Sequence, residues 1–174
     1  MAENANPTIQ PKSETRTELV LRDGRLQNVS ADSVFELIRD IVDPEHPYTL
    51  EQLKVVSRED IVVGSVLHGK NDNSDDNIHT DCICRKGLPL EYVAVTFTPT
   101  VPHCSMAGII GLSIRRQLER HIPDRWIRVL VKEGTHTSDT ALNKQLNDKD
   151  RVMAAFENSD LLDILDSNIK AIGE

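Results

Sequence analysis

The sequence predicts one α+β or α/β domain, in which a small mixed β-sheet is packed by helices. The prediction follows from two hydrophobic periodicities that alternate along the chain. Apolar residues recur at helical spacing in residues 34–41, 105–120, 137–151 and 161–172. Strand-like segments, β-branched or alternating between apolar and polar, are residues 53–56, 61–67, 90–97 and 126–132. The 174 residues suffice for a single domain with a modest tail.

The first part of the chain, residues 1–29, is predicted to be a flexible tail, and residues 30–174 form the predicted domain. The tail is polar and contains prolines, with a single apolar cluster at residues 19–21. Ser30 is expected to cap the first helix. Asp43 is expected to end it, because the residue before a proline is pushed out of the α region. The apolar stripe of this helix consists of Val34, Leu37, Ile38 and Ile41.

A polar stretch separates the strand at residues 61–67 from the next one. Residues 68–89 hold a dense run of Asn, Asp and Ser, so we expect an acidic loop inserted at the tip of a hairpin. Residues 90–97 then alternate like a half-buried strand. This alternation predicts that Val93, Val95 and Phe97 share one face.

A helix is predicted to follow this strand, after the turn at residues 99–104. Its expected inward residues are Met106, Ile109, Ile110, Ile114 and Leu118. Gly108 and Gly111 weaken a helix, so their presence predicts the close approach of another backbone. The next strand, residues 126–132, leads through a turn to a helix that is expected to run to Arg151.

Composition and charge narrow the classes of function. The net charge is −8 and aromatic residues make up 3% of the chain, so neither a basic patch for phosphates nor a stacking platform for nucleic acid is expected. No apolar run approaches the roughly 18 residues of a membrane span, and the polar N-terminus does not resemble a signal peptide. Three unevenly spaced cysteines indicate a reducing compartment. We therefore expect protein partners, no direct nucleic acid and no membrane.

Cys104 is the leading candidate for a functional residue. It follows two prolines and precedes a predicted helix, where backbone N–H groups and the helix dipole favour an anion. The adjacent His103 can add positive charge. Such a setting is expected to lower the thiol pKa from about 8.5 towards about 3.5–7.5. The alternative is a buried and inert structural cysteine, since free cysteines are often buried.

Two further groups of residues are candidates for binding a metal or a partner. They are His79, Cys82 and Cys84 in the insertion, and Asp43, Glu45 and His46 after the first helix. The first group has the spacing His-x-x-Cys-x-Cys, which can contribute to a zinc site; the alternative is that these residues are incidental. In the second group, the alternative role of Asp43 is to end the helix by forming hydrogen bonds within its own turn.

His136 is expected to lie near Cys104. Both residues follow a strand and precede a helix, and neighbouring parallel strands bring such positions to one edge of a sheet. A pair of Cys104 with His136 or His103 would be nucleophilic, which gives the hypothesis of a thiol-dependent enzyme. The alternative for residues 135–137 is a helix-capping turn. The sequence contains no phosphate-binding loop, dinucleotide fingerprint or zinc-protease motif.

Several of these segments together resemble one protein family. They are residues 38–51, with Asp-Pro-Glu-His-Pro at 43–47; residues 98–112, with Pro-His-Cys-Ser-Met at 102–106; residues 133–136; and residues 143–152. In this order they resemble the small α/β subunit of the cytosolic iron–sulfur assembly targeting complex, the Galla-type family, and in particular its general-purpose paralogue. The likeness spans about residues 31–170, interrupted by the insertion, whose two cysteines are not family residues.

The resemblance implies a non-enzymatic adaptor of the cytoplasm and nucleus. Such a protein joins a WD40 propeller subunit and a HEAT-repeat adaptor, and helps to deliver iron–sulfur clusters to apo client proteins. The resemblance also implies that Cys104 is the reactive cysteine and that homodimers, including domain-swapped ones, occur. The partner-binding candidates are Asp43, Glu45, His46, His136, Asn143 and Lys144.

Ligand counting restricts what Cys104 can do with a cluster. Iron–sulfur clusters usually need four ligands, mostly thiolates, and the core of this chain offers one. No stably bound cofactor is therefore expected. Cys104 would share a chain-bridging cluster, pass one on transiently, or bind a partner without contacting iron.

Overall fold

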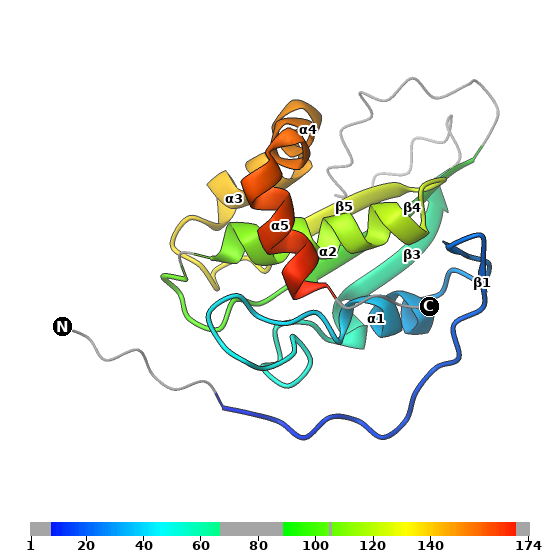
Figure 1. Cartoon of the computed structure of the whole chain (residues 1–174), viewed down its shortest axis with the longest axis horizontal. Helices are drawn as coiled ribbons and strands as arrows, with labels where there is room; N and C mark the ends of the chain where they lie inside the picture. The colour runs from blue at the N-terminus through cyan, green and yellow to red at the C-terminus, as the bar shows by residue number, and fades with distance from the viewer. Residues whose placement is uncertain (1–7, 67–88, 105, 170–174) are drawn as a thin grey trace.

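A three-stranded β-sheet with helices packed on one face is the centre of the fold (Figure 1). The structure is a computed structural model that describes residues 8–66, 89–104 and 106–169. The strands are β3 (Ile61–Val66), β4 (Leu90–Phe97) and β5 (Trp126–Val131), in that order across the sheet. β4 pairs antiparallel with β3 and parallel with β5, so the predicted mixed sheet is confirmed.

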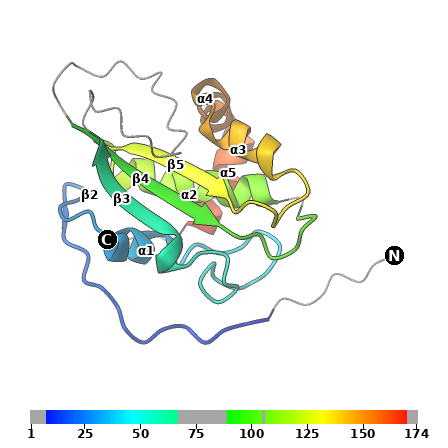
Figure 2. The ribbon, with the colours of Figure 1, turned by 180° about the vertical axis from the view of Figure 1, so that it is seen from behind.

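Helices and a small hairpin complete the described part of the chain. The helices are α1 (Ala31–Ile38), α2 (Ala107–His121), α3 (Asp139–Asn147), α4 (Lys149–Glu157) and α5 (Ser159–Asn168). A short 3-10 helix, η1 (Arg58–Asp60), precedes β3, and β1 (Leu21–Arg22) pairs with β2 (Arg25–Leu26). α1 and α2 cover one face of the sheet and α3 lies along β5, while Figure 2 shows the other face with no described helix in front. Within the described ranges, no helix is both long enough and apolar enough to cross a bilayer.

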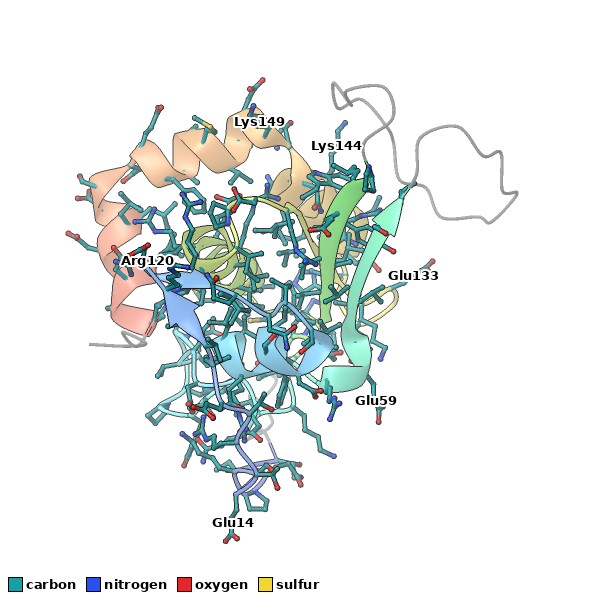
Figure 3. The ribbon with its side chains drawn as sticks, turned by 90° about the vertical axis from the view of Figure 1, so that its right-hand side faces the viewer. Glu14, Glu59, Arg120, Glu133, Lys144 and Lys149 are labelled. Atoms are coloured by element: carbon teal, nitrogen blue, oxygen red, sulfur yellow. The ribbon has the colours of Figure 1, made fainter. Side chains whose placement is uncertain are left out.

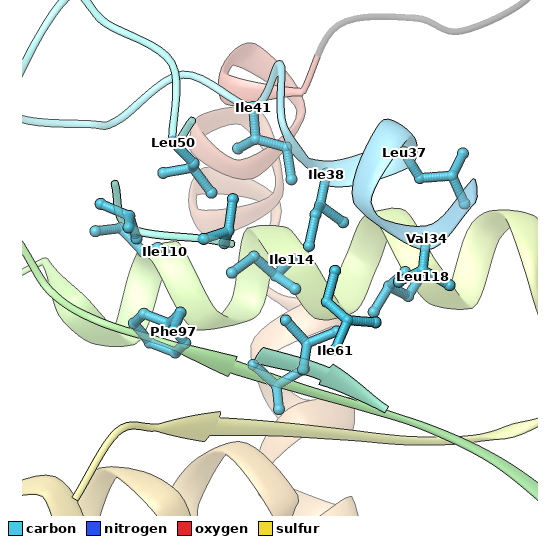
Figure 4. Packing of buried hydrophobic residues seen from close by; sticks show 14 of the residues in the cluster. Val34, Leu37, Ile38, Ile41, Leu50, Ile61, Phe97, Ile110, Ile114 and Leu118 are labelled. Carbon is cyan, nitrogen blue, oxygen red and sulfur yellow. The ribbon is translucent and has the colours of Figure 1, made fainter. Parts of the chain in front are cut away.

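The hydrophobic core lies between α1, α2 and the covered face of the sheet (Figure 4). The two helices contribute, among others, Val34, Leu37, Ile38, Ile110, Ile114 and Leu118. Val93, Val95 and Phe97 of β4 are buried and the residues between them are partly exposed, which confirms the predicted face of this strand. Ser30 caps α1 as predicted, since its hydroxyl accepts a hydrogen bond from the N–H of Ser33.

The segment at residues 53–56, which the pattern predicts as a strand, instead belongs to a turn. Lys54 has a positive φ of 54°, and the N–H of Val55 donates back to the carbonyl of Leu50. Val55 and Val56 are nevertheless buried. The apolar pattern therefore predicts the burial of these side chains correctly, but their strand conformation wrongly, because a turn can also direct β-branched side chains into a core.

Helix boundaries also differ from the prediction. α1 ends at Ile38, before the expected end at Asp43, so Ile41 is buried from the turn that follows the helix. The helix predicted over residues 137–151 is divided into α3 and α4, and Asp148 lies at the break. Its carboxylate accepts hydrogen bonds from the N–H groups of Asp150 and Arg151, and such a side chain favours a new helix start over continuation of the old one. Met106, predicted to face inward, is 38% exposed, because α2 begins only after it.

Gly111 lies where α2 meets α3. A Cβ added to Gly111 would come within 2.6 Å of the side chain of Leu146, whereas one added to Gly108 would lie 3.8 Å from Leu142, an ordinary contact. The predicted close approach is therefore present at Gly111 only. It is made by a buried leucine side chain and not by another backbone.

We expect the two glycine-to-alanine substitutions to have opposite effects on the free energy of unfolding. Gly108→Ala should raise it by about 0.5–1 kcal/mol, because alanine is the better helix former. Gly111→Ala should lower it by up to about 2 kcal/mol, since crowding against Leu146 outweighs the same gain. Urea denaturation of both variants measures the difference, and Leu146→Ala should relieve the defect in a double variant. Equal stabilisation by the two alanines would contradict the packing described here.

Residues 8–29, expected within a flexible tail, lie against the domain in the structure. Leu26 of β2 is 7% exposed and belongs to the core, and the N–H of Gln10 donates to the carbonyl of Gln52. We call residues 8–19 the N-terminal strap; Figure 3 shows it below α1, with Glu14 labelled. The contacts of residues 10–17 are polar, so a search for apolar periodicity does not find them, while Leu19 at the end of the strap packs against the core. Residues 1–7, and the predicted insertion except Pro89, lie outside the described residues.

Candidate functional site around Cys104

Cys104 lies where three loops meet at one end of the sheet. Because β4 and β5 are parallel, the loops that follow them leave the sheet side by side, and His136 lies beside Cys104 as predicted. The N–H of Thr137 also donates to the carbonyl of Pro102, at 3.0 Å. The third loop follows α1 and brings Glu45 to the thiol.

His136 binds the backbone of the Cys104 loop. Its Nδ1 accepts a hydrogen bond from the N–H of Ser138 at 3.0 Å, and its Nε2 lies 3.1 Å from the carbonyl oxygen of Cys104. This network assigns the neutral tautomer with the proton on Nε2, which donates to that carbonyl. Both ring nitrogens are thus engaged away from the sulfur. His103 is exposed, whereas the thiol is buried, so neither histidine is placed as the base of a Cys–His pair.

The loop after α1 is shaped by Asp43. Its Oδ1 accepts hydrogen bonds from the N–H groups of Glu45 and His46 at 2.8 and 3.0 Å, the turn-forming role considered for this residue. The N–H of Asp43 donates to the carbonyl of Tyr48 at 3.0 Å and closes the loop. This turn presents Glu45 so that its Oε2 accepts a hydrogen bond from the thiol of Cys104 at 3.3 Å. Glu45 is exposed as a residue, and its hydrogen bond to the thiol is partly buried.

The thiol of Cys104 is held in its protonated form. Cys104 is 4% exposed, and this burial raises its pKa to about 11; the hydrogen bond to Glu45 and the charges of Glu45 and Asp43 act in the same direction. The hydrogen bond from the N–H of Met106 acts against them. The expected lowering of the thiol pKa is therefore wrong. The helix dipole has little influence because α2 begins only at Ala107, whereas two carboxylates lie close to the sulfur.

Asp43 adds a second unusual feature to this loop. It is 3% exposed, and within the part of the chain that the structure describes its Oδ2 has no hydrogen-bond partner. Buried polar atoms are rarely left without a partner, and such exceptions are often found at functional sites. The candidate site thus combines a buried thiol, the carboxylate of an exposed residue that accepts its hydrogen bond and a buried carboxylate in the same loop.

The other predicted metal ligands do not add to this site. Among residues 8–66, 89–104 and 106–169, no group of three or more His, Cys, Asp or Glu side chains is arranged to bind a metal ion. Cys104 is the free cysteine of these ranges. His79, Cys82 and Cys84, the weaker candidates for a zinc site, lie outside the described residues.

Asn143 and Asn147 of α3 pair with the outer edge of β5. The Oδ1 of Asn143 accepts from the N–H of Val131 at 2.7 Å, and its Nδ2 donates to the carbonyl of Val131 at 3.2 Å. Asn147 forms the same pair of bonds with Val129, at 3.3 and 2.8 Å. Asn143, a candidate for partner binding, thus makes a structural contact, while Lys144 beside it is exposed. Sequence analysis does not single out Asn147; the available signal is two asparagines at i, i+4 spacing on one helix face.

Comparison with known proteins finds relatives that match over nearly all of this chain and no matching family model. The chain is 43% identical to Protein AE7 of Arabidopsis thaliana over 167 residues, which cover 94% of this chain and 92% of that protein. It is 41% identical to cytosolic iron-sulfur assembly component 2B of Mus musculus, with coverages of 98% and 93%. It is 39% identical to the MIP18 family protein galla-2 of Drosophila melanogaster, with coverages of 98% and 97%.

Proposed function

Because the chain belongs to the MIP18 family of cytosolic iron–sulfur assembly component 2 proteins, we propose that it is an adaptor of the cytosolic targeting complex. In this role it helps to deliver iron–sulfur clusters to cytosolic and nuclear apoproteins and catalyses no reaction of its own. Similarity over nearly the full length of the relatives carries the proposal. Membership of this family by itself gives the chain a part in cytosolic iron–sulfur cluster assembly.

In the proposed role, Cys104 is the thiol that contacts the cluster or the recipient. A thiol must lose its proton before its sulfur can bind iron, and Glu45 is the hydrogen-bond acceptor already in place. The cluster is cargo and not a resident cofactor. A cluster takes four ligands and this site supplies one thiolate, so the remaining ligands would come from a second chain or from the client. Contact with the cluster is therefore transient or chain-bridging.

The proposed partners are a WD40 propeller subunit, a HEAT-repeat adaptor and apo iron–sulfur client proteins. A second copy of the chain, including a domain-swapped copy, is a further proposed partner. Support comes from the relatives' description as an assembly component and from the loops around the buried thiol. Glu45 and His103 are exposed on these loops and His46 is half-buried, so they form the proposed contact surface.

Cys104→Ser tests the role of the thiol. Serine keeps the shape and can still donate a hydrogen bond to Glu45, but it is a poor ligand for iron. In cells that depend on this variant, we expect cytosolic client enzymes to lose most of their activity, while the tagged protein still recovers the propeller and HEAT-repeat partners. Enzyme assays and co-purification measure the two outcomes, with Arg22→Ala, at an exposed position of β1 outside the proposed contact surface, as the control. Full client activity with Cys104→Ser at normal abundance would refute the proposed role of the thiol.

A further inference from the structure

Arg39 follows α1 and is 1% exposed although it is charged. All five N–H donors of its guanidinium group are used. Nε donates to Glu51 at 2.9 Å, Nη1 to Glu36 at 3.0 Å and to the carbonyl of Thr15 at 3.1 Å, and Nη2 to Glu51 at 2.6 Å and to the carbonyl of Ser13 at 3.0 Å. Two of the five acceptors are main-chain carbonyls of the N-terminal strap. The strap therefore completes the burial and pairing of Arg39.

Two cationic side chains of the strap, four residues apart, form ion pairs with carboxylates on and next to α1. Lys12 Nζ lies 3.0 Å from Asp40 Oδ1, and Arg16 Nη1 lies 2.6 Å from Asp40 Oδ2 and 2.7 Å from Glu36 Oε1. Burial alone would raise the pKa of Asp40, but the hydrogen bonds from Arg16 and Lys12 lower it to about 2. The Asp40 carboxylate thus remains ionised and favours cations. We call Arg39 with Glu36, Asp40 and Glu51 the strap groove.

The strap is recognised through its backbone and its two cations, without an apolar anchor in the groove. The N–H of Ser13 donates to Glu51 at 3.1 Å, and the N–H of Thr17 donates to Glu36 at 3.2 Å. Residues 11–18 are all exposed. Ion pairs that solvent reaches are screened by salt and individually weak. Residues 11–18, held in this way, can leave and rebind while Leu19 stays packed against the core.

We propose that the strap groove is a docking site for an extended segment of a partner protein that carries two cationic side chains four residues apart. The strap is then an internal competitor for this site. Charge complementarity favours such an occupant, since three carboxylates surround the groove and Arg39 takes carbonyls two residues apart, as an extended backbone presents them. The proposal goes beyond the assembly role and does not depend on Cys104.

Exchange of the strap for a partner segment keeps every buried charge paired. A segment with the same pattern would offer Arg39 two carbonyls and would offer Asp40 and Glu36 two cations. Neither Arg39 nor its carboxylates would then remain unpaired after exchange, which is the costly outcome for buried charges. The side chains of Ser13, Thr15 and Thr17 are exposed, so the groove recognises the spacing of the cations and not the residues between them.

Full-length Arg16→Glu tests the proposal, because repulsion from Asp40 and Glu36 should free the groove. The probe is a fluorescent peptide with the sequence of residues 8–20. We expect it to bind Arg16→Glu about tenfold or more tightly than the wild-type chain, where the strap competes. Arg22→Glu, an exposed cation of β1 outside the groove, is the matched control and should behave like the wild type. Arg16→Gln is measured in parallel so that the comparison holds if Arg16→Glu does not fold.

Peptides with altered spacing decide what the groove recognises. Moving the second cation from position 16 to position 15 or 17 should abolish binding to Arg16→Glu, and added salt should weaken the binding of the original peptide. Binding that ignores the spacing, or no binding to either Arg16 variant at low salt, would overturn the proposal. A wild-type dimer in size-exclusion chromatography that the peptide dissociates would also overturn it, because the occupant would then be the strap of a second copy.

Discussion

Iodoacetamide is expected to alkylate Cys104 of the folded protein at pH 8 about two hundred times more slowly than it alkylates an unperturbed cysteine. Only the thiolate reacts. With a pKa of about 11, roughly one Cys104 thiol in a thousand is ionised at pH 8, compared with about a quarter of thiols at the ordinary pKa of about 8.5. Since the pKa is raised, the rate should climb with pH until about 11. Burial, the largest cause of the shift, also restricts access of the reagent and slows the reaction further.

Glu45→Gln is the matched variant for this experiment. Glutamine keeps the size of the side chain and removes its charge, so the pKa of the Cys104 thiol should fall. The alkylation rate should then rise, by about tenfold for a fall of one in the thiol pKa. Mass spectrometry of the peptide that contains Cys104 separates it from Cys82 and Cys84. His103→Gln should leave the rate unchanged. A wild-type rate equal to that of a free cysteine would show that the thiol is not buried as described.

The raised thiol pKa also bears on the proposed adaptor role. A neutral, buried thiol that donates a hydrogen bond to a carboxylate resists alkylation and oxidation, which both act on thiolates. We therefore expect Cys104 to stay reduced in the free protein and to become reactive only when a partner or client displaces Glu45 and exposes the thiol. Alkylation of Cys104 in the reconstituted complex, compared with the free chain, measures this difference.

Arg39→Ala is expected to lower the free energy of unfolding by about 3–5 kcal/mol. The substitution removes the cation that pairs with the largely buried carboxylate of Glu51, leaves Glu36 paired with Arg16 alone, and frees two strap carbonyls. It also removes the guanidinium group that lies 5.2 Å from the ring centroid of Phe35. Urea denaturation at pH 7 measures the loss. Arg22→Ala, at an exposed position, is the control and should change the free energy by less than about 0.5 kcal/mol.

The pH dependence of this loss follows from Glu36. Its burial alone would raise its pKa, but hydrogen bonds from Arg16, the N–H of Thr17 and Arg39 lower the pKa below its ordinary value. A lowered carboxyl pKa contributes stability above the pKa of the unfolded state, and this contribution is lost as pH falls through the folded value. The difference between wild type and Arg39→Ala should therefore shrink in acid. A difference under about 1 kcal/mol at pH 7 would contradict a buried ionic centre at Arg39.

Hydrophobic patterning predicted the elements whose structure depends on local burial. The stripe of α1 and the alternation of β4 are each contained in a single segment, so the fold class and these elements follow from the sequence. His136 could be placed beside Cys104 because the ends of adjacent parallel strands meet by topology alone. Patterning also suggested a strand at residues 53–56, where the chain instead forms a turn that buries the same side chains.

The chemistry of Cys104 could not be predicted from its neighbours in the sequence. Burial raises the thiol pKa most, and a hydrogen bond to Glu45, 59 residues away, raises it further, which opposes the effect expected from a nearby helix. The strap escaped prediction for a different reason. Its contacts to Arg39, Glu36 and Asp40 are made by charged side chains and backbone groups. Such contacts produce no periodic pattern of apolar residues in the sequence.

The asparagines of α3 affect how the sheet meets other chains. An open strand edge is a template on which an extended chain can add and aggregate. Asn143 and Asn147 occupy the N–H and carbonyl groups of Val131 and Val129 that an added strand would need. Along these residues, two side-chain amides take the place of a fourth strand. The outer edge of β5 is thus protected from strand addition at these two positions. β5 leads into the loop that holds His136 against Cys104.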